Sequence, residues 1–133
     1  MRGRLAKLPC TVLLVMDCCY AGSFDAGKKK RGLPNEAGDL VRELVRDDQG
    51  LVVMCGASKE QESGEEARLG HGYFTQALIE GLEGKAASRR DGLVYLSGLQ
   101  NYVEERVREL SHDEQYPTIG KPTLIRSFPL SRP

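Results

Sequence analysis

The sequence has no tryptophan, only two histidines and no excess of either charge. Lysine plus arginine and aspartate plus glutamate both number 19, so nothing in the charge favours nucleic acid or an anionic membrane as a partner. No stretch approaches the roughly 20 apolar residues that a membrane-spanning helix needs. The apolar run 11–16 follows basic residues, as in a signal peptide, but it is short and ends at Asp17. We therefore expect a cytoplasmic protein.

Cysteine is scarce as well, and its pattern excludes two kinds of site. The four cysteines stand at positions 10, 18, 19 and 55, which resembles neither a disulfide framework nor the paired Cys-x-x-Cys spacing of a zinc site. Adjacent strand residues point to opposite faces, which disfavours a redox or metal site built on Cys18 and Cys19. We therefore expect no metal, and we expect Cys10 and Cys55 to pack as small apolar side chains.

The composition is otherwise that of one globular domain, with 40% hydrophobic and 29% charged residues in 133. The runs 11–16 and 51–55 are continuous and apolar, which is typical of strands buried on both faces of a parallel sheet. Apolar residues at helical spacing predict three helices, at 36–45, 74–82 and 98–110. Ser97 is the expected N-cap of the last helix, and short extended segments are expected at 93–96 and 123–125. This order predicts an α/β fold with a mainly parallel sheet.

The ends of the two apolar runs are where chemistry is expected. Ligand sites of parallel sheets lie outside the carboxyl ends of the strands, and the loops that leave these ends are expected to begin at Asp17 and Gly56. The segment 17–22, which contains Cys19, sits directly at the carboxyl end of the first strand, and a thiol attacks acyl carbon readily because a few per cent is thiolate at neutral pH. Its own backbone N–H can point at the developing oxyanion. We predict Cys19 as the nucleophile and as an oxyanion donor.

The segment Asp17-Cys18-Cys19-Tyr20-Ala21-Gly22 resembles the D-[SC]-C-H-[SA]-G motif of caspase-like cysteine peptidases, especially metacaspases and their bacterial relatives. The family's nucleophile matches Cys19, and Tyr20 stands where the family usually has histidine. Further segments similar to family motifs follow in the family's order, at 56–65, 70–78, 91–103 and 115–117. The resemblance implies a caspase-like three-layer α/β/α sandwich. Residues 1–133 would form the nucleophile-bearing part of that catalytic domain, with the N-terminal strands missing.

The resemblance also implies a catalytic histidine upstream of the nucleophile, and no histidine precedes Cys19. His71 follows the second strand and opens a helix, so we favour a structural role for it. His112 lies beside two acidic residues and is expected to be solvated. We therefore expect the general acid–base to come from the missing N-terminal half or from a complementing chain. Residues 1–133 alone would be inactive, and a silent scaffold module is the alternative hypothesis.

By the same resemblance, Asp17 and Ser58 are substrate-binding residues. In metacaspase-like members the matching carboxylate pairs with a substrate arginine or lysine, and a carboxylate binds a guanidinium group in a bidentate manner. The predicted substrate is therefore a peptide or protein cleaved after arginine or lysine. The alternative for Asp17 is a carboxylate that caps backbone N–H groups at the end of the strand.

Two charged loops complete the expectations. The first has a basic run where the family is often cleaved during activation, so it is either an autoprocessing site or a solvated loop; its residues are Lys28, Lys29, Lys30 and Arg31. The second has acidic residues that could bind Ca²⁺, as in some metacaspases, namely Glu60, Glu62, Glu65 and Glu66. Scattered carboxylates on a polar loop are usually only a solvated surface. We therefore expect no cofactor.

Overall fold

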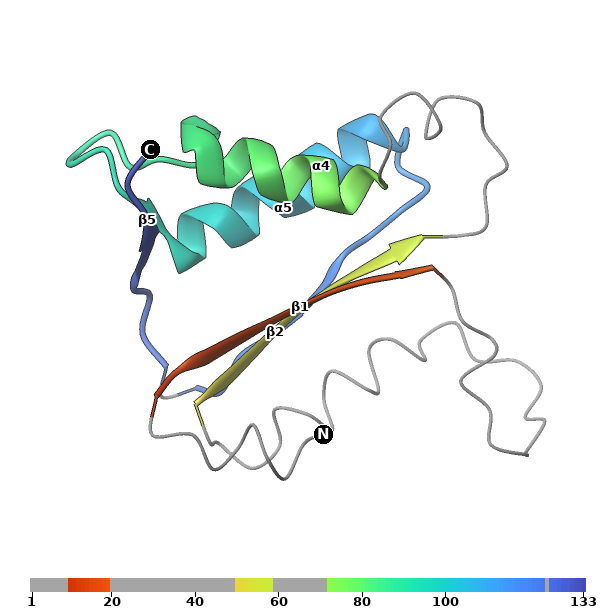
Figure 1. The fold of residues 1–133 in the computed structure, drawn as a ribbon. Coiled ribbons are helices and arrows are strands. Elements are labelled where there is room, and N and C mark those ends of the chain that lie inside the picture. Colours follow the sequence, from red (N-terminus) through yellow and green to blue (C-terminus); the bar gives the residue numbers. More distant parts are fainter. Residues whose placement is uncertain (1–9, 20–49, 59–71, 124) are drawn as a thin grey trace.

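The structure is a computed structural model that describes residues 10–19, 50–58, 72–123 and 125–133, without the side chains of residues 18, 19, 57 and 58. The described residues form both strands and helices, which agrees with the α/β fold that the sequence predicts (Figure 1). The elements are β1 Val12–Cys19, β2 Leu51–Ser58, α4 Tyr73–Glu80, η1 Gly81–Lys85, β3 Val94–Tyr95, α5 Leu96–Leu110, β4 Thr118–Gly120 and β5 Pro129–Ser131. Within these residues no helix is both long and apolar enough to cross a membrane.

The main sheet has the order β1-β2-β4. β1 and β2 are parallel and remain in register from Val12↔Leu51 to Cys19↔Ser58. β4 runs antiparallel along the other edge of β2, and β3 and β5 form a separate antiparallel pair. The sequence predicted that the loops begin at Asp17 and Gly56. This prediction is wrong, because both residues still lie within the paired strands. Strand pairing is made by backbone hydrogen bonds, so it can continue along residues with polar side chains beyond the end of the apolar run.

Both faces of β2 are buried, as its continuous apolar run predicts. On one face Met54 packs with Phe74, Leu99 and Val103 from the two helices, and α4 and α5 lie side by side over this face of the sheet (Figure 1). On the other face Val53 and its strand neighbours form a second cluster, with Leu51, Cys55, Val12, Leu14 and Met16. Side chains alternate between the faces of a strand, so one strand contributes to both clusters.

The helix predicted at 74–82 is confirmed as α4, which continues into the π-helical turn η1 and changes direction at Gly84, where φ is +124°. Burial of Phe74 and Ala77 explains its apolar spacing. α5 packs close to this helix at Gly81, where a Cβ atom would lie only 2.6 Å from Cδ1 of Leu99. Glycine at this position therefore permits the short distance between the two helices.

Three local predictions are wrong. Tyr95 rather than Ser97 is the N-cap of α5, and the Ser97 hydroxyl instead lies 2.9 Å from the Ser127 hydroxyl. Residues 123 and 125 are not in a strand, because the closing strand is β5, whose Ser131 pairs with Val94. Cys10 is exposed, whereas Cys55 is buried as expected. In the first two cases a partner distant in sequence decides the outcome. The helix predicted at 36–45 lies outside the described residues.

Candidate active site

The carboxyl ends of β1 and β2 lie next to each other in the sheet (Figure 1). Asp17 pairs with Gly56, and two residues further along Cys19 pairs with Ser58. Neighbouring strands are separated by roughly 4.8 Å, so the backbones of the predicted nucleophile and of a predicted substrate-binding residue are adjacent. The parallel pairing brings together residues from two distant parts of the sequence at the edge where ligands are expected.

Asp17 places a carboxylate beside the first turn of α4. Its side chain is exposed, and its Oδ2 atom accepts a hydrogen bond from the hydroxyl of Thr75. Gly72, the N-cap of α4, has no side-chain cap of its own, and the first turn of the helix contains no acidic residue. The partial positive charge of a helix N-terminus favours a nearby carboxylate. Asp17 therefore supplies from β1 the negative charge that α4 itself lacks.

The packing of Phe74 explains why α4 begins at this place. Phe74 is only 2% exposed, and a Cβ atom at Gly56 would lie 2.4 Å from its Cγ atom. The aromatic ring thus rests directly on the backbone of β2, where only glycine leaves enough room. Asp17 and Gly56 are register partners, and paired residues of neighbouring strands share a face of the sheet. The contact of Phe74 with Gly56 therefore brings Thr75 to Asp17.

The comparison with protein families bears on this arrangement. The family model described as the caspase domain, peptidase family C14, matches residues 1–129. The chain belongs to the caspase domain family. This family consists of cysteine peptidases, which are hydrolases that cleave peptide bonds. Searches of curated proteins and of solved structures found no match.

The other end of α4 in this caspase domain is joined to α5 through a buried carboxylate. Glu80 is 8% exposed, and its side chain accepts hydrogen bonds from Tyr102 at 2.7 Å and from Nε of Arg106 at 2.9 Å. Gln76 donates a further bond at 2.8 Å, and Lys85 forms an ion pair at 3.1 Å. A buried charge with so many partners is stabilised rather than neutralised.

The pKa values of this group follow from the same contacts. The bond from Arg106, followed by those from Gln76 and Tyr102, holds the pKa of Glu80 well below its ordinary value, although burial opposes the shift. Burial, together with the hydrogen bond to Glu80, raises the pKa of Tyr102 to about 12. Glu80 therefore stays ionised and Tyr102 stays protonated near neutral pH. The local sequence patterns did not indicate this group, although Gln76–Glu80 and Tyr102–Arg106 both have the four-residue spacing of helix neighbours.

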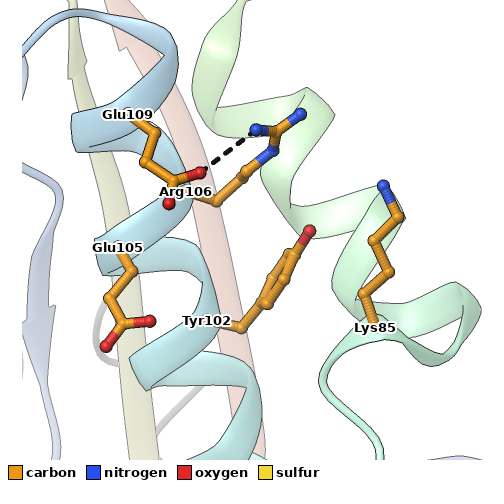
Figure 2. A pocket seen from close by; sticks show the side chains of 5 residues that line it. All are labelled: Lys85, Tyr102, Glu105, Arg106 and Glu109. Atoms are coloured by element: carbon orange, nitrogen blue, oxygen red, sulfur yellow. Dashed lines mark hydrogen bonds and ion pairs between the residues drawn. The ribbon is translucent and has the colours of Figure 1, made fainter.

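Figure 2 shows the polar pocket beside this group. Tyr102 and Arg106 extend from α5 toward the segment that carries Lys85, and Glu105 and Glu109 complete the lining. Both cations of the pocket already pair with Glu80, and Arg106 also contacts Glu109 at 3.2 Å. The pocket therefore offers no uncompensated cation to a ligand. The pairing of Arg106 with Glu80 instead joins α5 to α4.

The segment after α5 returns the chain to the sheet of the caspase domain. His112 and Asp113 have positive φ values of 51° and 62°, and the Asp113 carboxylate accepts a hydrogen bond from Arg108 at 2.8 Å. Thr118 then pairs with Cys55 on β2. The His112 side chain is exposed, which confirms the expectation that it is solvated.

Several predicted site residues lie outside the described part of the chain. They are the basic run Lys28 to Arg31, His71 and the acidic residues Glu60, Glu62, Glu65 and Glu66. Cys19 and Ser58 are placed by their backbones alone. Within the described residues, no group of three or more histidine, cysteine, aspartate or glutamate side chains could hold a metal ion.

Proposed function

We propose that Cys19 is the nucleophile of a caspase-family endopeptidase that cleaves after arginine or lysine. One observation carries the proposal. In a chain whose family is that of the caspase domain, Cys19 ends a strand at the carboxyl edge of a parallel pair, two residues after an exposed carboxylate. Ligands of parallel sheets bind at that edge, so the backbone of Cys19 lies where a peptide substrate would be expected to bind.

The reaction would follow the chemistry of an activated thiol. The thiolate of Cys19 attacks the carbonyl carbon of the scissile bond, and the carbonyl π electrons move onto oxygen, where the backbone N–H of Cys19 donates a hydrogen bond. The C–N bond then breaks, and the amine leaves with a proton from a histidine. Water, deprotonated by the same histidine, hydrolyses the thioester and returns the thiolate.

We propose that this histidine comes from outside residues 1–133, either from a preceding half of the domain or from a complementing chain. Two observations support this. No histidine precedes Cys19 in the sequence, and His112 is an exposed residue beyond the end of α5. The added segment would complete a three-layer α/β/α sandwich, which agrees with the burial of both faces of β2. A cytoplasmic location would keep the thiol reduced.

The preference for a basic substrate residue rests on Asp17. Its carboxylate is exposed, and the partner found for it among the described residues is the neutral hydroxyl of Thr75. Thr75 is a neutral donor and the N-terminus of α4 has only a partial positive charge, so a guanidinium or ammonium group can still pair with the carboxylate. Ser58, the register partner of Cys19, is proposed as a second substrate-binding residue.

The test uses covalent labelling of the full chain by a peptidyl arginyl chloromethyl ketone, an alkylation of the thiolate in which chloride leaves and no histidine has to protonate a leaving amine. We expect the reagent to modify Cys19 at least tenfold faster than Cys10, which is an exposed cysteine and serves as an internal control. A Cys19→Ser variant should lose the fast reaction, and a Cys10→Ser variant should retain it. Equal labelling of the two thiols would refute the assignment of Cys19 and would favour a silent scaffold module. Mass spectrometry of proteolytic fragments distinguishes the sites.

A further inference from the structure

The hydrogen bond between Thr75 and Asp17 joins the first turn of α4 to the carboxyl edge of the sheet. We propose that Thr75 is a positioning residue for substrate selectivity, which holds the Asp17 carboxylate in the orientation that binds a basic side chain. The inference rests on the proposed function, because it assumes that Asp17 binds the substrate cation. It adds Thr75, a residue from a different element, which would act on the substrate through Asp17.

The chemical nature of the donor is the first argument. A carboxylate offers two oxygens with about four acceptor positions, and the Thr75 hydroxyl uses one of them at Oδ2. An arginine or lysine in its place would orient the carboxylate but would also neutralise its charge. A hydroxyl orients the group and leaves the charge for the substrate. An exposed carboxylate without such a bond would lose rotamer freedom when it binds a cation, and that loss would weaken binding.

Gly72 gives an independent observation at the same carboxylate. A Cβ atom there would lie 3.3 Å from Oδ2 and 3.6 Å from Oδ1 of Asp17. The φ angle of Gly72 is −69°, which any residue can adopt, so backbone freedom does not explain the glycine. The glycine is explained by the space that the Asp17 carboxylate needs. Gly72 and Thr75 therefore restrict Asp17 from two positions of one helical turn.

The turn that carries both residues is itself held firmly. The backbone N–H of Gln76 donates to the carbonyl of Gly72 at 3.0 Å, and Phe74 packs against Gly56 on β2. Glu80 then ties the far end of the helix to α5. Because this turn is held in place, the Thr75 hydroxyl can fix the orientation of the Asp17 carboxylate, which is what a positioning residue has to do.

The experiment compares labelling of Cys19 in the full chain by two electrophiles that differ in charge, an arginyl and a norleucyl chloromethyl ketone. The ratio of the two rates measures charge selectivity, and the rate with iodoacetamide measures thiol reactivity alone. Thr75→Val removes the hydroxyl at nearly constant volume, and we expect it to lower the ratio about tenfold without changing the iodoacetamide rate. Thr75→Ser should restore the ratio.

Two further variants sharpen the result. Gly72→Ala places a methyl group against the carboxylate and should lower the ratio in the same way as Thr75→Val. Thr123→Val removes the hydroxyl of an exposed threonine and should leave the ratio unchanged. If Thr75→Val slows all three reagents equally, Thr75 has a merely structural role and the inference is overturned.

Asp17→Asn separates this inference from the proposed function. If Asp17→Asn abolishes the selectivity while Thr75→Val and Gly72→Ala preserve it, Asp17 binds the cation without help from α4, and only the inference fails. If Asp17→Asn leaves the selectivity unchanged, the pocket role of Asp17 fails and the inference fails with it. Loss of selectivity in Asp17→Asn and Thr75→Val, with recovery in Thr75→Ser, supports both.

Discussion

Glu80 on α4 and Arg106 on α5 are joined by a hydrogen bond of 2.9 Å between a carboxylate oxygen and Nε of the guanidinium group. The side chain of Glu80 is 10% exposed and that of Arg106 is 30% exposed, so the pair is partly removed from water. A second bond of 3.4 Å joins Nη2 of Arg106 to the other carboxylate oxygen. This pair holds together the two helices that cover one face of the sheet.

Replacement of Arg106 should therefore destabilise the fold. In Arg106→Met the aliphatic packing is kept, but Glu80 loses its strongest partner, and we expect a loss of about 1–3 kcal/mol in the free energy of unfolding. Urea denaturation provides the measurement. Arg108→Met is the matched control, because Arg108 lies on the same helix and forms an ion pair with Asp113 in which both side chains are largely exposed. A loss as large in the control as in Arg106→Met would contradict the prediction.

Acid should weaken the interaction between Glu80 and Arg106. The pKa of Glu80 in the folded chain lies well below its ordinary value of 4.5, so the unfolded state binds a proton at a pH where the folded state does not. The stabilisation from Glu80 is therefore complete above about pH 4.5 and is lost as the pH falls below that value. Urea midpoints measured across the acidic range should decline more steeply in the original protein than in Glu80→Gln. Parallel declines would show that other carboxylates dominate.

Gly56→Ala tests the contact that places α4 over the sheet. The added methyl group would lie 2.4 Å from Cγ of Phe74, so the ring must move, and we expect a cost of about 1–3 kcal/mol in unfolding free energy. Phe74→Leu should relieve part of this conflict. The double variant should then lose less than the sum of the two single losses, which a double-mutant cycle measures. Strict additivity would mean that the two positions do not interact.

The basic run Lys28 to Arg31 provides a test of basic specificity in an active preparation. If the histidine-bearing segment is supplied and the enzyme cleaves after arginine or lysine, the chain should be cut within this run. Cys19→Ala in the same preparation should stay intact. Mass spectrometry of the two samples identifies the site of cleavage. A cut that persists in Cys19→Ala would assign it to a contaminating protease.

The sequence by itself determined the elements that rest on local patterns. Continuous apolar runs predicted both long strands, and helical spacing predicted α4 and most of α5, because burial of one face imposes a period on neighbouring residues. The order of short motifs indicated the caspase family, which the family match confirms. The position of Cys19 in the segment that follows the apolar run was also visible in the sequence. These inferences need no knowledge of which residues meet across the fold.

Only the tertiary structure decided which distant residues meet. The bond between Asp17 and Thr75 joins positions 58 residues apart, and Glu80 and Arg106 are 26 residues apart. Ser97 would make a good N-cap by composition, yet its hydroxyl contacts Ser127 instead. Local spacing reports which face of an element is buried, but it does not report the element that buries it. Register and packing set those contacts, and they depend on the whole chain at once.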